Sequence, residues 1–327
     1  MNVFAYRLPF DSTCRIMECD DPIYGFQEDD AEYFMVHPFL PDSPILSFPL
    51  KRELDNIPFD IVNHNNTVET ISETTKDEYL KYVSSIISFI SQGKALKVVA
   101  SRRKILNKTS CDISSLFASL CNVYPGAYVF FISSPLFGSW IGASPELLLK
   151  KNGETIETVA LAGTRPIGNR NEWDEKNYVE QKIVTDFITQ ILEKFKLKYT
   201  VGKTITQNAG PVEHIMTSLR ASISEGQIDI DSLLKALSPT PALSGYPVSE
   251  AITIINDNEK SPRELYGGFM GLKERNGDFR MNVILRCAKL MPDHIILYAG
   301  GGIVKDSDPY LEWIETERKL STLLKLI

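Results

Sequence analysis

Residues 297–324 read LYAGGGIVKDSDPYLEWIETERKLSTLL, and the rest of the chain is interpreted from the strand, turn and helix that this segment predicts. An apolar strand leads into three glycines, an Asp-Ser-Asp-Pro turn and then a helix. On that helix Glu312, Glu315 and Lys319 fall within a sector of about 60°, while apolar side chains gather on the other side. Two carboxylates and an ammonium on one face fit either a solvated surface with an i,i+4 ion pair or a charged site beside the glycine turn.

Composition restricts the possible classes of protein. The chain has 327 residues, of which 43% are hydrophobic, which is enough for one large α/β unit or two domains. A net charge of −7 without a basic stripe argues against nucleic acid or an anionic membrane as the main partner. Five cysteines without CxxC spacing indicate neither a disulfide framework nor a zinc site. With no export signal and no apolar run of about 18 residues, we expect a cytoplasmic protein that does not span a membrane.

The pattern of elements changes along the chain. Residues 1–74 are rich in Pro and Asp and predict short strands and loops without evident chemistry, whereas residues 75–327 hold all the candidate motifs. A helix is expected from Thr75 to a C-terminal cap at Gly93, and several closely linked strands follow it. Short links, including the Asn-Gly turn at 152–153, predict antiparallel pairing. FRMNVILRCAKL is expected to form one strand of a hairpin with HIILYAGG.

A helix is expected at about 173–197, and it carries an anomalous charge. Its apolar stripe includes Ile183, Val184, Phe187 and Ile191, and Glu180 falls in the centre of that stripe. A carboxylate that points toward a core is costly unless a partner satisfies it. Glu180 therefore either reaches water one turn before the buried part or belongs to a charged site.

Nine ordered strings resemble the chorismate-utilising enzymes, most closely the isochorismate synthase branch. They cover three quarters of the chain and read KVVASR (97–102), GASPELLL (142–149), LAGTRP (161–166), EKNYVEQKIV (175–184), PTPALSGYP (239–247), RELYGG (263–268), LRCAKL (285–290), YAGGGIV (298–304) and EWIETERKL (312–320). The resemblance implies an α/β (α+β) fold: a single large domain of mostly antiparallel sheets, flanked by helices, with a central active-site cleft. It also implies that residues 75–327 form the chorismate-binding catalytic core and that residues 1–74 are the N-terminal part of the fold.

The resemblance implies a reaction in which water adds to C2 of chorismate and the C4 hydroxyl leaves. Such a reaction needs a base, an acid and a cation on the ring carboxylate. Lys97 matches the general base, which requires a lowered pKa, and Glu146 matches the general acid, which requires a raised one. Without the resemblance, each would be interpreted as an ordinary charge at the start of a strand.

Further site residues also follow from the resemblance. Glu180 and Glu315 match the ligands of Mg²⁺, the implied cofactor, with Glu312 as a nearby contributor. Arg286 and Lys319 match contacts to the substrate carboxylates. The remaining matches are backbone, wall or ring-pocket contacts: Gly163, Thr164, Ala242, Tyr266, Leu285, Tyr298 and Gly300.

Two positions separate the branches of the family. Ammonia-using members typically have glutamine where Lys97 stands, and one branch has a lysine nucleophile where Ala162 stands, so Lys97 with Ala162 implies water chemistry. We therefore expect isochorismate as the product, no amidotransferase partner and a monomer, in menaquinone or siderophore synthesis. The alternatives are a salicylate synthase, which adds pyruvate elimination, and a non-catalytic chorismate-binding subunit, against which the Lys97 and Glu146 pair argues.

Overall fold

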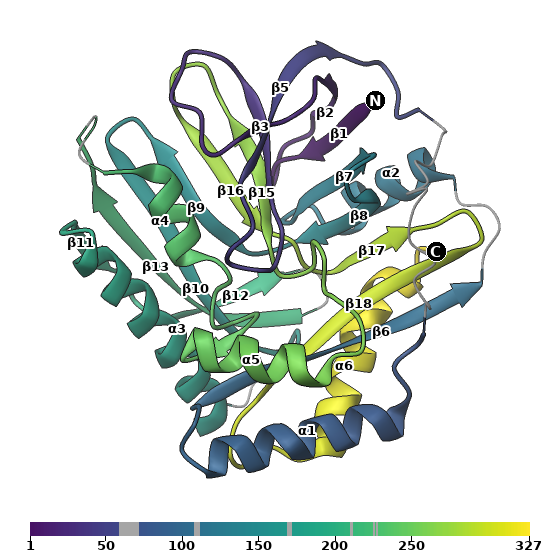
Figure 1. Cartoon of the computed structure of the whole chain (residues 1–327), viewed down its shortest axis with the longest axis vertical. Helices are drawn as coiled ribbons and strands as arrows, with labels where there is room; N and C mark the ends of the chain where they lie inside the picture. The colour runs from purple at the N-terminus through teal and green to yellow at the C-terminus, as the bar shows by residue number, and fades with distance from the viewer. Residues whose placement is uncertain (59–71, 108–111, 169–171, 210–211, 225, 227) are drawn as a thin grey trace.

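Strands dominate the computed structural model of the chain (Figure 1). It describes residues 1–327 except 59–71, 108–111, 169–171, 210–211, 225 and 227. The described strands are β1 (Asn2–Arg7), β2 (Cys14–Cys19), β3 (Ile23–Tyr24), β4 (Tyr33–His37), β5 (Leu46–Glu53), β6 (Lys97–Asn107), β7 (Tyr128–Ser134), β8 (Gly138–Ser144), β9 (Leu147–Asn152), β10 (Thr155–Pro166), β11 (Lys198–Val201), β12 (Ile205–Ala209), β13 (Val212–Ser222), β14 (Gly245–Tyr246), β15 (Phe269–Lys273), β16 (Phe279–Val283), β17 (Cys287–Leu290) and β18 (His294–Ile303). The described helices are α1 (Lys76–Ser91), α2 (Ile113–Val123), α3 (Glu175–Lys194), α4 (Ile230–Leu237), α5 (Val248–Asn258) and α6 (Pro309–Leu324).

Antiparallel pairing arranges the strands in two sheets that share β5. The first sheet runs β5–β2–β1–β7–β8–β17–β18–β6–β14. The second runs β3–β5–β4–β15–β16–β9–β10–β13, and β13 also pairs with β11 and β12. Within β5, Leu46–Pro49 pair in the second sheet, whereas Leu50, Arg52 and Glu53 pair with β2 in the first. Residues 1–58 thus contribute strands to both sheets of one α+β domain, while the assignment of 1–74 as the N-terminal part of the fold and of 75–327 as the catalytic core stays a prediction.

Two neighbouring strands cross from one sheet to the other at the same place. β8 and β17 are partners in the first sheet, and their continuations β9 and β16 are partners in the second. At this bend Pro145 and Glu146 link β8 to β9, and residues 284–286 link β16 to β17. The prediction of a single strand at 279–290 was therefore wrong. Arg286 adopts a left-handed φ of 48°, which interrupts the extended chain. The bend places Glu146 and Arg286 beside each other in the fold.

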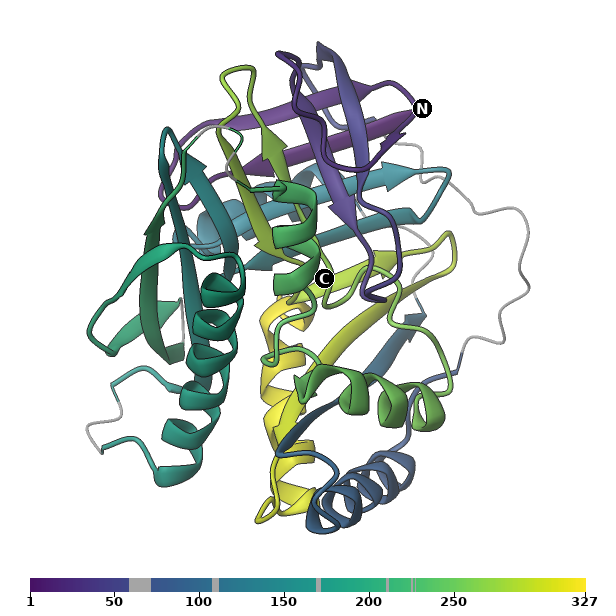
Figure 2. The ribbon, with the colours of Figure 1, turned by 60° about the vertical axis from the view of Figure 1, so that its left-hand side comes forward.

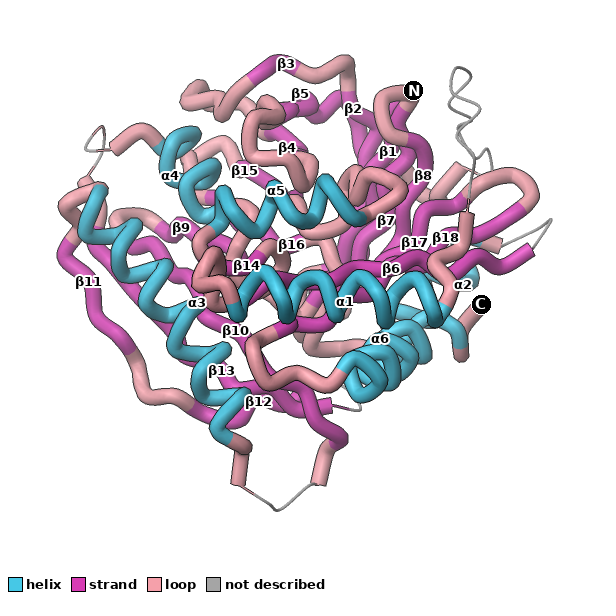
Figure 3. Tube along the Cα trace, turned by 60° about the horizontal axis from the view of Figure 1, so that its bottom comes forward, coloured by secondary structure: helices cyan, strands magenta, loops and turns pink. Residues whose placement is uncertain are grey.

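The central strands of the first sheet, β7, β8 and β17, are buried on both faces. Along β7, Tyr128, Phe130 and Ile132 join the core between the two sheets, while Val129 and Phe131 join a second core beneath α2 and α6. Strands that are buried on both faces read as continuous apolar runs, which explains the segment YVFFIS. In the core between the sheets, Phe4 of β1 stacks on Phe34 of β4 with ring centroids 4.3 Å apart. A third cluster packs α1 and α5 against β6, and these two helices lie side by side in Figure 3.

Short polar side chains cap most of the helices. Thr75 and Glu78 form a capping box at α1, and Gly93, with φ of 75°, follows its C-terminal end as expected. Asp174 and Asp308 accept backbone hydrogen bonds at the starts of α3 and α6. These two helices, teal and yellow in Figure 2, face each other, and an ion pair between Lys176 and Glu312 joins them. No helix in the described ranges is long and apolar enough to cross a membrane.

Candidate active site

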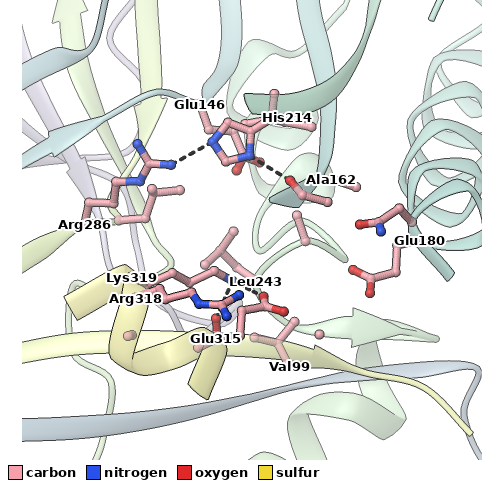
Figure 4. A pocket seen from close by; sticks show the side chains of 18 of the residues that line it. Val99, Glu146, Ala162, Glu180, His214, Leu243, Arg286, Glu315, Arg318 and Lys319 are labelled. Carbon is pink, nitrogen blue, oxygen red and sulfur yellow. Dashed lines mark hydrogen bonds and ion pairs between the residues drawn. The ribbon is translucent and has the colours of Figure 1, made fainter. Parts of the chain in front are cut away.

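A cavity of about 400 Å³ lies between the bend that joins the sheets and helices α3 and α6 (Figure 4). All but two of the residues expected at the site line it: Lys97, Glu146, Gly163, Glu180, Ala242, Tyr266, Leu285, Arg286, Tyr298, Gly300, Glu315 and Lys319. The two exceptions are Glu312, which is buried but does not line the cavity, and Thr164, whose side chain is outside the described part of the chain. Segments far apart in sequence thus converge on one site, although their individual roles stay predictions.

Lys97 is the first residue of β6, and its side chain is buried, with only 2% exposed. Its ammonium lies 3.1 Å from Oε2 of Glu180. Across the ladder, β18 has glycine at 302, and a Cβ there would lie 2.8 Å from Cε of Lys97 and 2.7 Å from Oε2 of Glu180. The glycine therefore leaves the space that this ion pair occupies.

Glu146 lies at the bend between the sheets and is buried. Burial raises the pKa of this carboxyl to about 7, although Lys97 and a hydrogen bond from Thr240 act in the opposite direction. Thr240 Oγ1 donates to Glu146 Oε1 at 3.5 Å. A carboxyl with this pKa can carry a proton near neutral pH, as a general acid must.

Arg286 and His214 form a fixed pair on the same side of the cavity. Nη2 of Arg286 donates to Nε2 of His214 at 2.7 Å, so the His214 ring must accept there and donate from Nδ1 to the carbonyl of Gly163, also at 2.7 Å. Burial, reinforced by Arg286, lowers the pKa of His214 to about 3, which keeps the ring neutral. A register shift in β10 between Ala162 and Arg165 accompanies the left-handed φ of 61° at Gly163, where the chain bulges toward His214.

Three glutamates face one another from α3 and α6, and each has a lysine partner. Lys176 Nζ lies 2.6 Å from Oε1 of Glu312 and 3.7 Å from Oε1 of Glu180. Lys319 Nζ lies 2.8 Å from Oε1 of Glu315 and donates to the carbonyl of Gly300 at 2.7 Å. Glu180 is buried on the apolar side of α3, as its periodicity indicated, and Lys97 and Lys176 satisfy it there.

The environments of these glutamates differ. Burial raises the pKa of Glu312, and neighbouring Glu315 adds to this while Lys176 opposes it. Burial also raises the pKa of Glu315, but Lys319 and Lys176 more than offset this, so the net shift is downward. Oε1 of Glu312 accepts from Ser307 at 2.7 Å, whereas the described residues provide no hydrogen-bond partner for its buried Oε2. An orphaned carboxylate oxygen in a buried site is costly and is suited to a cation.

The chemistry of this set of oxygen donors fits Mg²⁺. Three carboxylates on two facing helices supply the hard oxygen ligands that this ion prefers, and the unpartnered Oε2 of Glu312 is an available donor. As the side chains stand, however, no group of three acidic, histidine or cysteine residues in the described ranges is close enough to hold a metal. The lysine pairs hold the carboxylates instead, so a metal would have to displace or rearrange at least one ammonium.

Sequence reasoning missed several lining residues. Lys176, His214 and Arg318 all line the cavity, as do Val99 and Leu243. Lys176 stands four residues before Glu180 on α3, and this spacing was a usable signal. His214 gave none, since it enters the site only because β13 pairs with the bulged part of β10.

An aromatic stack forms one wall of the cavity. The ring centroids of Tyr266 and Tyr298 are 5.5 Å apart, and Tyr298 stacks in turn on buried Trp140 at 5.2 Å. Both tyrosines were expected to line a ring pocket, and both line the cavity. Such a rigid flat wall suits a planar ring.

The cavity carries an excess of positive charge in an acidic protein. Its lining includes five basic side chains, Lys97, Lys176, Arg286, Arg318 and Lys319, against the three acidic side chains of Asp174, Glu180 and Glu315. Glu146 adds a fourth negative charge only above its pKa of about 7. A buried polar cavity with a protonated acid, a lysine and clustered cations defines the site of an enzyme that acts on a small anionic molecule.

Comparison with known proteins identifies the family. The family model for chorismate-binding enzymes matches residues 51–327, and the chain belongs to this family. Isochorismate synthase EntC of Escherichia coli (strain K12) is 33% identical over 273 residues, which cover 80% of this chain and 70% of EntC. Anthranilate synthase component 1 of Neisseria meningitidis (serogroup A) is 28% identical over 273 residues, covering 79% of this chain and 54% of that protein.

A solved structure confirms the fold. The crystal structure of DhbC from Bacillus anthracis superposes with a TM-score of 0.83. The superposition covers 99% of this chain and 96% of the DhbC chain, and the two sequences are 23% identical. The expected architecture, mostly antiparallel sheets with flanking helices, is therefore confirmed as a fold that this solved structure shares.

Proposed function

We propose that the protein converts chorismate to isochorismate. The observation that carries the proposal is that buried Lys97 and buried Glu146, whose pKa is about 7, line one positively charged cavity. EntC, which is named as an isochorismate synthase, supports this assignment over amination. Ala162 lines the cavity in place of a lysine nucleophile, which further supports water chemistry.

The proposed reaction balances without a second substrate. Lys97, as the free amine, accepts a proton from the water that bonds to C2 of the ring, and the ring double bonds shift. Glu146 donates its proton to the C4 oxygen, so that this group leaves as water when its C–O bond breaks. Because one water enters and one leaves, the net change is an isomerisation. Nζ of Lys97 lies 3.1 Å from Oε2 of Glu180, so this ion pair must open before the lysine can accept a proton from the water.

The remaining side chains hold the substrate. Lys319 and Arg286 lie on different sides of the cavity, and each can bind one of the two carboxylates of chorismate (Figure 4). Tyr266, Tyr298 and Leu285 form the wall against which the ring packs. Fixed placement of the ring between the acid and the base lowers the entropic part of the barrier.

Mg²⁺ is the proposed cofactor, with Glu180, Glu315 and Glu312 as the residues that would hold it. When bound, the ion supplies positive charge that neutralises the ring carboxylate and stabilises charge developing on the ring. Glu180→Gln and Glu315→Gln should each abolish magnesium-dependent turnover. A melting titration with MgCl₂ in these variants should show a smaller rise in Tm than in the unmodified protein.

Product analysis tests the proposal. The purified protein is incubated with chorismate and MgCl₂, and the products are separated by chromatography and identified by mass spectrometry. Isochorismate alone is expected, and Lys97→Ala and Glu146→Gln should each reduce its rate of formation at least about 100-fold. Salicylate with pyruvate would replace the proposal with a salicylate synthase, and absence of any product would leave a chorismate-binding protein without this activity.

A further inference from the structure

Lys176 differs from the other lysines of the site in what it contacts. Its ammonium bridges two helices, since it meets Glu180 on its own helix α3 and Glu312 on α6. Among the described residues, the partners found for this ammonium are carboxylates, whereas Lys319 is also anchored to the Gly300 carbonyl. The ammonium of Lys176 thus contacts two of the three proposed metal ligands, Glu180 and Glu312.

Exposure indicates which ammonium can leave. The Lys176 side chain is 32% exposed and lies in the first turn of α3, so a long flexible stem connects its charge to solvent. The Lys97 side chain is 2% exposed and has no comparable route outward. Glu312 in contrast is almost completely enclosed, with its side chain 3% exposed and one oxygen unpartnered.

We propose that Lys176 is an internal counter-ion that occupies the place of the divalent cation when the metal is absent and competes with it. The proposal rests on the proposed magnesium site. A single ammonium balances only part of the charge of two carboxylates and leaves Oε2 of Glu312 unsatisfied, whereas a divalent ion can satisfy both. Lys176 therefore keeps α3 and α6 together in the metal-free protein and lowers its affinity for Mg²⁺.

Calorimetric titration of the metal-free protein with MgCl₂, without chorismate, tests this role. Lys176→Met, which keeps the length of the stem but removes the charge, should bind Mg²⁺ at least about tenfold more tightly. Its Tm without metal should be lower than that of the unmodified protein and should rise more on addition of MgCl₂. Lys176→Arg, which retains the charge, should restore the lower affinity.

The matched control is Lys182→Met on the same helix. Lys182 is exposed and forms an i,i+4 pair with Asp186, 2.5 Å away, so its removal should leave the magnesium affinity unchanged. Equal or weaker binding by Lys176→Met, or no magnesium binding by any of the proteins, would overturn the proposal. Failure of the unmodified protein to form isochorismate would reject the proposed function alone, because the titration contains no chorismate and reports only the metal.

Discussion

Burial of Glu146 should make the stability of the protein depend on pH in an unusual direction. Its carboxyl has a pKa of about 7 in the folded chain, against an ordinary value of 4.5. Between these two pH values the folded state holds a proton on Glu146 that the unfolded state has lost. Unfolding therefore becomes more favourable as pH rises from about 4.5 to about 7, whereas a salt-bridged carboxylate would give the reverse dependence.

The magnitude follows from the shift in pKa. One pKa unit corresponds to about 1.4 kcal/mol, so a shift of roughly 2.5 units costs up to about 3 kcal/mol of unfolding free energy by pH 8. Glu146→Gln keeps the shape of the side chain but cannot ionise. The difference in unfolding free energy between Glu146→Gln and the unmodified protein should thus grow by about 2.5 kcal/mol in favour of the variant from pH 5 to pH 8.

Urea unfolding in EDTA at several pH values measures this difference, since pH effects common to both proteins cancel. Glu154→Gln serves as the control because Glu154 is exposed in the turn between β9 and β10. Its unfolding free energy should run parallel to that of the unmodified protein at every pH. If the Glu146→Gln curve is equally parallel, the carboxyl is ionised in the folded protein at neutral pH and the reasoning for a buried acid fails.

Three further predictions concern activity. If Glu146 is the proton donor, kcat/KM for chorismate should fall above about pH 7 as the carboxyl ionises, and an activity that stays level to pH 9 would exclude it as the acid. Gly302→Ala should reduce turnover at least about tenfold with little change in Tm, because the added Cβ lies within 3.0 Å of the flexible ends of Lys97 and Glu180; full activity would show that their positions do not matter. Ammonium or glutamine added to the assay should give no aminated ring product by mass spectrometry, and detection of anthranilate would reassign the reaction.

Local patterns in the sequence determined most of the elements. Periodicity and capping predicted α1, α3 and α6, and continuous apolar runs predicted β7 and the strands after it, because each depends on neighbours in the chain. The resemblance of nine short strings predicted the family, and all but two of the site residues that it named line the cavity. It also named Glu180 as a member of the site, which its position on the apolar stripe of α3 had only suggested.

Tertiary structure decided what the chain neighbours cannot specify. The strand expected at 279–290 is divided between two sheets, because the backbone at Arg286 turns where β8 and β17 of the first sheet continue as β9 and β16 of the second. The same bend brings Glu146 close to Arg286, 140 positions later in the chain.

Charge pairing was likewise a property of the folded chain. Lys176 and Glu312 are separated by 136 positions, yet their charged atoms lie 2.6 Å apart because α3 and α6 face each other. The pKa of Glu146 depends on how completely the cavity excludes water, and that of His214 on burial beside Arg286. Residue identity supplied the groups, but burial and distance set their charge states, since both arise only when distant segments pack together.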